Sequence, residues 1–199
     1  MLLVKPTVWT TRRKWLGNLV PALFWFPLAA IGVFTVAKNE QFLGPGLWFL
    51  AASTILGWLA VNQFGFFENR RMRLQLERIL KVQDSEVKGE FIFVGFATPK
   101  YSSMLDAHED VGFFQILPDR LVFVSETRRM ELMRSDLTKI GTRANVHTVL
   151  GLGRWVSVDA EVGEKKFRLL VEPRERSTML GSRRYGARLV TRLREWMKE

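Results

Sequence analysis

The sequence predicts a membrane protein built from a two-helix transmembrane hairpin and a mainly-β sandwich or barrel that ends in a C-terminal α-helix. Two long uncharged stretches, residues 15–37 and 41–67, predict the hairpin. Short apolar runs separated by polar turns, from about residue 88 to Pro173, predict the β domain. Apolar residues at helical spacing after that proline predict the closing helix.

The two uncharged stretches hold 23 and 27 residues without Asp, Glu, Lys or Arg. A helix rises about 1.5 Å per residue, so roughly 20 apolar residues cross the hydrocarbon core. We place the spans at about residues 15–37 and 43–66. A core hairpin of a soluble protein is disfavoured because core helices rarely run so long without a charge. A cleaved signal peptide is disfavoured because the first stretch is too long and contains Pro21 and Pro27.

Positive charge flanks the predicted hairpin on one side. Residues 1–40 carry five basic and one acidic residue, residues 68–82 carry five and two, and the connection at residues 38–41 is short and nearly neutral. Lys and Arg beside a span resist translocation. We therefore expect a multi-pass protein of the cell (inner or plasma) membrane with both termini cytoplasmic. The expected parts are a basic N-terminus (1–14), the hairpin (15–67), a juxtamembrane helix (68–82) and a cytoplasmic domain (83–199).

The juxtamembrane helix is predicted to be amphipathic because its apolar residues recur at helical spacing. These residues are Met72, Leu76, Ile79 and Leu80. Such a helix is either a solvated connector or lies flat on anionic lipid. Its arginines are candidate lipid or partner contacts, namely Arg70, Arg71 and Arg73.

The cytoplasmic domain alternates strands with turns before its final helix. The expected strands lie at residues 91–96, 113–117, 121–124, 130–133, 137–140, 155–160 and 165–171. The final helix is expected from about Glu175 to Met197, with a break possible at Gly181 or Gly186 because glycine weakens a helix. Gly151-Leu152-Gly153 is expected to be a flexible loop.

This order of hairpins and helix resembles the pleckstrin-homology superfamily, in particular its GRAM and bacterial PH-like branches, over roughly residues 88–198. The resemblance is carried by the strand-turn-strand pattern FQILPDRLVF at 114–123, residues 137–140, the hairpin at 155–171 and the final helix with Trp196. It implies a scaffold that binds phosphoinositides, peptides or proteins, or that self-assembles. The basic first hairpin of phosphoinositide-binding members is not evident, since residues 83–131 hold five basic and nine acidic residues.

Two groups of polar residues are candidate sites. Arg184, Arg188 and Arg192 share one face of the final helix and either contact anionic lipid or form a solvated surface. The loop before the first hairpin groups Asp106, His108, Glu109 and Asp110, a set for metal binding or acid–base chemistry, or for an ordinary hydrogen-bonded loop. No nucleophile or oxyanion motif accompanies this loop, and the chain has no cysteine, so we expect no catalytic residues, metal or cofactor.

The sequence therefore predicts a membrane-anchored cytoplasmic binding or scaffolding module that recruits a protein partner or self-associates as a homo-oligomer. Sensing of anionic lipid by the basic C-terminal helix is the alternative. An enzyme or transporter accessory subunit is a third. Nucleic-acid binding is disfavoured because aromatic residues are not interleaved with the basic ones.

Overall fold

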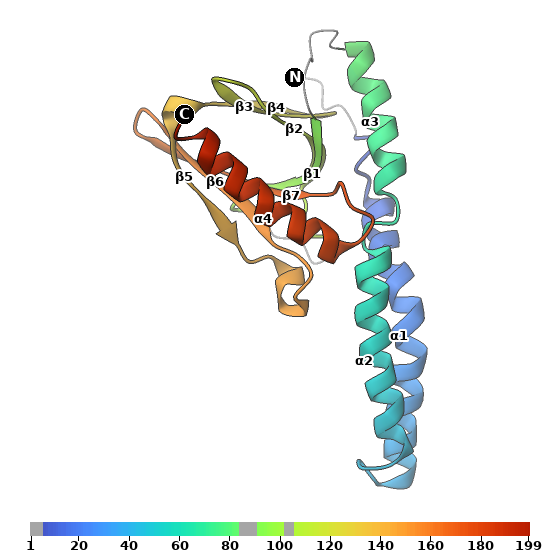
Figure 1. Ribbon diagram of the computed structural model, residues 1–199. Helices are drawn as coiled ribbons and strands as arrows, with labels where there is room; N and C mark the ends of the chain where they lie inside the picture. Colours follow the sequence, from blue (N-terminus) through green and yellow to red (C-terminus); the bar gives the residue numbers. More distant parts are fainter. Residues whose placement is uncertain (1–5, 84–90, 102–105) are drawn as a thin grey trace.

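The computed structural model describes residues 6–83, 91–101 and 106–199, and the start of the predicted cytoplasmic domain, residues 84–90, lies outside them. The helices are α1 (Thr11–Asn39), α2 (Pro45–Phe64), α3 (Asn69–Gln83) and α4 (Met179–Trp196), with short 3-10 turns η1 (Arg134–Asp136) and η2 (Val146–Leu150). The strands are β1 (Phe91–Ala97), β2 (Asp110–Ile116), β3 (Arg120–Ser125), β4 (Arg129–Met133), β5 (Leu137–Arg143), β6 (Trp155–Val162) and β7 (Lys165–Pro173). Figure 1 shows α1 and α2 as a long hairpin with the sheet domain beside one end of it.

Helices α1 and α2 are both long and apolar enough to cross a membrane, as the composition predicts. Small residues bring the two helices together. A Cβ on Gly46 would lie 2.6 Å from Val36 Cγ2, and a Cβ on Gly57 would likewise crowd the side chain of Trp25. Ser53 Oγ donates to the Trp25 carbonyl at 2.8 Å. Ser53 and Gly57 of α2 therefore pack against α1 of the same chain.

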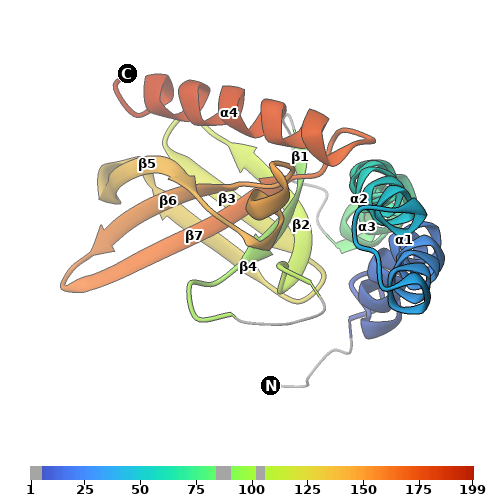
Figure 2. The ribbon, with the colours of Figure 1, turned by 90° about the horizontal axis from the view of Figure 1, so that it is seen from below.

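The seven strands form one antiparallel sheet in the order β4-β3-β2-β1-β7-β6-β5. Side chains alternate across each strand, so one face of every strand turns toward a common core that α4 covers (Figure 2). In β1 the core residues are Ile92, Val94 and Phe96, while Phe93 faces the opposite side. The predicted β domain with a C-terminal helix is confirmed at this level.

Helix α4 begins four residues later than predicted, at Met179. Thr178 caps it, because its Oγ1 accepts from Gly181 N at 3.1 Å. Glu175 lies before the helix, and its Oε1 accepts a hydrogen bond from Phe93 N at 2.6 Å. The helix continues through Gly186, which lies against Pro173 and Val156 and lets α4 approach the sheet closely.

Helix α3 packs on the outer face of the sheet. Its apolar residues Met72 and Leu76 are buried with Phe93 and Phe113, and Trp9 joins the same cluster. A solvated connector and a helix lying flat on lipid would both leave that apolar face outside the domain. The sheet itself covers the apolar face of α3 (Figure 1), while Arg70 and Arg71 on the same helix are exposed.

Candidate functional site

A buried group of charged side chains lies where the helical hairpin meets the sheet domain. The residues come from segments far apart in the sequence: Trp9 precedes α1, Asn69 begins α3, Asp106 and His108 precede β2, Asn145 precedes η2, and Glu172 and Arg174 lie at the end of β7. Charges are rarely buried unless they are paired and hydrogen-bonded. These residues satisfy one another, as the distances below show.

His108 is the centre of this network and is 1% exposed. Its Nδ1 lies 2.6 Å from Asp106 Oδ1, and its Nε2 lies 2.9 Å from Glu172 Oε2. The ring rests on Gly95 of β1, where a Cβ would collide with it. Since both ring nitrogens face carboxylates, both donate and the imidazole is held as a cation.

The electrostatic balance follows from this geometry. Burial alone lowers the pKa of His108, but Asp106 and Glu172 outweigh it and raise the pKa above 6.5. Burial likewise opposes ionisation of the two carboxyl groups, yet His108 holds the pKa values of both Asp106 and Glu172 below their ordinary values. Arg174 supplies the second positive charge, so two carboxylates balance two cations.

Arg174 joins the network to the hairpin side of the molecule. Its Nε donates to Asn69 Oδ1 at 2.8 Å, and Asn69 Nδ2 donates to the Arg174 carbonyl at 3.0 Å. Its guanidinium stacks on Phe66 and Trp9, with 4.5 and 4.9 Å to the ring centroids. Trp9 Nε1 in turn donates to the His108 carbonyl at 3.1 Å. The network therefore binds the sheet domain to the segments on either side of the hairpin.

The four residues predicted to act together in one loop are divided between two networks. Asp106 and His108 belong to the buried cluster. Glu109 pairs with Arg128 at 2.8 Å, and Asp110 accepts from the hydroxyls of Ser125 and Thr127 at 2.6 and 2.7 Å. The four residues therefore do not form one cluster of ligands. Among the described residues, no group of three His, Cys, Asp or Glu is placed to hold a metal ion.

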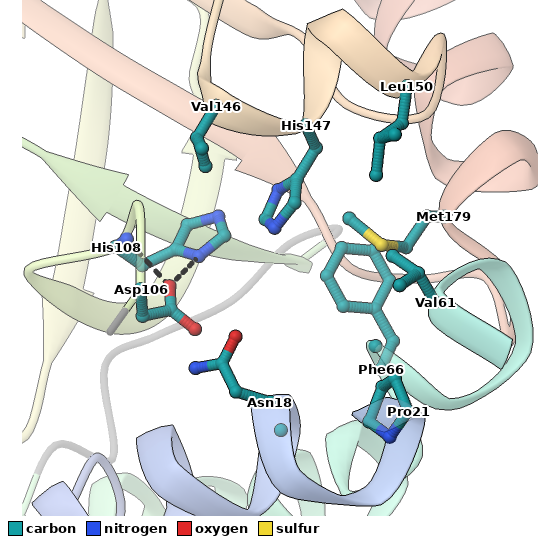
Figure 3. A pocket seen from close by; sticks show the side chains of 12 residues that line it. Asn18, Pro21, Val61, Phe66, Asp106, His108, Val146, His147, Leu150 and Met179 are labelled. Carbon is teal, nitrogen blue, oxygen red and sulfur yellow. Dashed lines mark hydrogen bonds and ion pairs between the residues drawn. The ribbon is translucent and has the colours of Figure 1, made fainter. Parts of the chain in front are cut away.

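A cavity of about 270 Å³ adjoins the cluster, between the ends of α1 and α2 and the sheet domain (Figure 3). Asp106, His147 and Asn18 border it together with apolar side chains from both halves of the molecule, among them Pro21 and Met179. Burial lowers the pKa of His147 below 6.5, so its ring is neutral at pH 7. Its Nδ1 is buried without a hydrogen-bond partner. This nitrogen can bond a small polar group that enters the cavity.

The free imidazole nitrogen at this site belongs to His147 and not to His108. A general base needs a free nitrogen within reach of the proton it removes. His108 has none, because both of its nitrogens are committed to carboxylates. Among the described residues that border the cavity, none is Ser, Thr, Cys or Lys, the side chains that serve most often as nucleophiles.

A separate groove of about 920 Å³ lies at the other end of the sheet domain, between the edge strands and the β6–β7 hairpin. Met130, Leu132 and Leu169 supply apolar surface, and Phe167 stands at the border with 43% of its surface exposed. The groove is also bordered by charged residues, namely Lys100, Lys139, Asp159, Glu161, Lys166 and Arg168. Arg168 is engaged by Asp159, with 2.5 Å between Nε and Oδ1.

The arginines predicted from the sequence as contacts do not gather in one place. Arg184, Arg188 and Arg192 are exposed on the outer face of α4. Arg70 and Arg71 are exposed on α3, whereas Arg73 forms ion pairs with Glu77 and Glu175 and so fastens α3 to the domain. Sequence reasoning missed Glu172 and Arg174. The available signal was Glu172 itself, a charged residue that directly follows the apolar run at 169–171. Its neighbours in the strand, Val171 and Pro173, are both buried.

The fold defines a class of protein: two helices with the length and apolarity of membrane spans, carrying a seven-stranded antiparallel sheet closed by a C-terminal helix. No protein-family model matches the chain, and no curated protein matches it. The candidate sites are therefore defined by their geometry.

His108 and Glu172 together contribute most to stability between about pH 4.5 and 6.5. The raised pKa of His108 stabilises the fold fully below its ordinary value of 6.5, and this contribution is lost as the pH rises through the folded-state pKa. The lowered pKa of Glu172 stabilises fully above its ordinary value of 4.5 and is lost as the pH falls through the folded-state pKa. The thermal unfolding midpoint of the detergent-solubilised protein is therefore expected to decrease below and above this pH range. In a His108→Gln variant the alkaline fall disappears, and an unchanged alkaline slope there would contradict the assignment.

Proposed function

We propose that this protein is a membrane-anchored cytoplasmic binding or scaffolding module whose sheet domain is PH-like and recruits an acidic segment of a protein partner or of a second copy. The hairpin supplies the anchor. Support for a PH-like domain comes from the arrangement of four sequential strands beside three more, with α4 covering the core. The groove between the edge strands and the β6–β7 hairpin is the observation that carries the proposed binding role.

The proposed orientation has both termini in the cytoplasm of a cell-membrane protein. It is supported by basic residues at the domain end of the hairpin, where Arg13 Nε pairs with Glu68 Oε2 at 3.0 Å, and by the nearly neutral turn at residues 38–41. A cysteine introduced at Gln41 then reacts with an impermeant thiol reagent on intact cells, and one at Ser177 does not. Labelling at Ser177 from outside would overturn this orientation.

A scaffold needs a fixed position, and the contacts between hairpin and domain provide one. Asn62 Oδ1 accepts from Leu180 N, the second residue of α4, at 2.9 Å. Phe66 is buried with Leu152 and Met179 of the domain. Together with the Arg174 network, these contacts join the domain to the anchor at several points, so the groove is held at a constant place relative to the membrane.

The charge of the groove favours an acidic partner with apolar side chains. Three exposed lysines border it, Lys100, Lys139 and Lys166, against one carboxylate outside the Asp159–Arg168 pair, Glu161. Apolar side chains of the partner would pack on Phe167, which is exposed at the border of the groove. Charge complementarity of this kind selects partners and speeds encounter.

Lipid sensing by α4, the alternative, is less well supported by the arrangement. In Figure 2, which looks along the hairpin, α4 lies along one side of the sheet. Its exposed face therefore points sideways, parallel to the plane of a membrane that the hairpin crosses. Arg184, Arg188 and Arg192 would not lie on that membrane.

The groove is tested by placing a photo-crosslinking amino acid at Phe167 in the full-length protein in its own membrane. We expect an adduct with an acidic protein or with a second copy. The yield of that adduct is expected to fall about tenfold in the Lys139→Glu/Lys166→Glu double variant, because two exposed ion pairs of up to about 1 kcal/mol each become repulsive. The same amino acid at Ala187, exposed on α4, is the matched control. An adduct no stronger than that at Ala187, or insensitive to charge reversal, contradicts the proposal.

A further inference from the structure

The connection between β5 and β6 forms an uncharged apolar tip on the sheet domain. Residues 144–153 contain no Asp, Glu, Lys or Arg, and they are flanked by Arg143 and Arg154. Three apolar side chains of η2 are exposed, Val149 at 90%, Val146 at 66% and Leu150 at 45%, and the last two also border the cavity between the hairpin and the domain (Figure 3). An apolar group this exposed on a short turn is typical of a surface that meets another apolar phase.

The tip lies beside the second apolar helix. In Figure 1 it is the part of the sheet domain that reaches furthest along α2. Trp58 Nε1, from α2, donates to the Leu150 carbonyl at 2.9 Å, which fixes the tip against the helix. The apolar side chains of η2 are therefore at the same level as the apolar surface of α2.

That level falls inside the cytoplasmic half of a membrane. Helix α2 has 20 residues, about 30 Å at 1.5 Å per residue, which equals the thickness of a hydrocarbon core. Trp58 lies six residues before its last residue, Phe64, so its Cα is about 9 Å below the cytoplasmic boundary of that core. Amphipathic segments that lie in the interface reach about 5–10 Å into it.

The backbone of the tip is suited to that environment, because most of its polar groups are bonded within the protein. Thr148 N and Gly151 N donate within the turn, to the carbonyls of Asn145 and Thr148. The Leu150 carbonyl accepts from Trp58, and the Gly151 carbonyl accepts from Arg183. Each backbone group left without a partner in hydrocarbon costs several kcal/mol, so these bonds lower the cost of placing the turn at the edge of that region.

We propose that the η2 tip, Val146–Leu150, inserts into the cytoplasmic leaflet of the bilayer that the hairpin spans. The acyl chains just below the headgroups are its partner, and Arg143, Arg154 and Arg183 at its base lie at the level of the phosphates. This inference rests on the hairpin being a membrane anchor. It assigns the domain a lipid contact that is apolar and separate from the basic face of α4.

The test uses single cysteines, which the chain allows because it has none of its own. An environment-sensitive fluorophore is attached at Val149, at Ile55 in the middle of α2, or at Val162, the last residue of β6. Val162 is an exposed valine and serves as the matched control. Each full-length protein is reconstituted in phosphatidylcholine vesicles that contain lipids with a nitroxide at a shallow or a deep acyl carbon. All three side chains are exposed, so the substitutions remove little packing, and circular dichroism checks the sheet.

We expect the fluorophore at Val149 to be quenched most by the shallow nitroxide, that at Ile55 most by the deep one, and that at Val162 only by aqueous iodide. If the fluorophore at Val149 is quenched only by iodide while that at Ile55 is quenched by the deep nitroxide, the proposed insertion of the tip is wrong but the membrane anchor stands. If the fluorophores at both positions are quenched only by iodide, the hairpin is not a membrane anchor. A fluorophore at Val149 that is shielded from water but untouched by either nitroxide would place a protein surface there, and the lipid proposal would be wrong.

Discussion

Replacing Glu172 with Gln lowers the free energy of unfolding by about 3–5 kcal/mol, the usual cost of removing one member of a buried ion pair. Glu172 is 1% exposed and accepts from three donors: His108 Nε2 at 2.9 Å, Asn145 Nδ2 at 3.0 Å and Arg154 N at 3.1 Å. Glutamine has the same shape, but its amide nitrogen faces at least one of these donors. The His108 cation also loses one of its two balancing charges.

The measurement is urea or thermal unfolding of the purified full-length protein in mild detergent, beside a Glu164→Gln variant. Glu164 lies exposed in the β6–β7 turn, so the same chemical change there is expected to alter stability by less than about 0.5 kcal/mol. If Glu172→Gln behaved like that control, the Glu172–His108 bond would be contributing nothing to the fold.

The parts of the fold that were predicted depend on patterns within a short stretch of chain. Uncharged length identifies α1 and α2, and alternation identifies strands such as β6 and β7, because each pattern reports burial of a local face. Periodicity also identifies α3 as amphipathic. It does not say what covers the apolar face, and the answer, the outer side of β1 and β2, depends on a docking that no local pattern describes.

The candidate site was only partly predictable for the same reason. Asp106 and His108 are close in sequence and attracted notice together with Glu109 and Asp110, but Glu109 bonds Arg128 and Asp110 bonds Ser125 and Thr127, all at the β3–β4 connection. Glu172 is 64 residues from His108, and Arg174 is 105 residues from Asn69. Such pairs are recognisable in advance only as isolated charges at buried strand positions, without any indication of their partners.

The same contacts explain why the anchor and the domain form one structure. Trp9, Phe66 and Asn69 belong to the chain on either side of the hairpin, and each contacts Arg174. A substitution in the cluster is therefore expected to loosen the docking as well as the domain. The position of the groove and of the η2 tip relative to the hairpin depends on that docking.

Gly95→Ala is the sharpest test of the cluster, because it adds one methyl group where the imidazole lies. A Cβ on Gly95 would lie 2.5 Å from His108 Nε2 and closer still to Cδ2. The ring has no room to retreat, since Asp106 and Glu172 hold both its nitrogens. Overpacking a core costs about 1–3 kcal/mol where side chains can adjust, so we expect at least about 3 kcal/mol here.

Gly141→Ala is the matched control, because Gly141 lies in β5 and a Cβ there meets nothing within 4 Å. Alanine also restricts the unfolded chain, so Gly141→Ala is expected to leave stability unchanged or raise it by less than about 1 kcal/mol. Unfolding of both variants in detergent gives the comparison, and the pH profile separates the causes. If His108 is displaced, Gly95→Ala also loses the alkaline fall in stability that the raised pKa of His108 produces. A variant that is destabilised but keeps that fall would show strain in β1 alone, with the imidazole still between its two carboxylates.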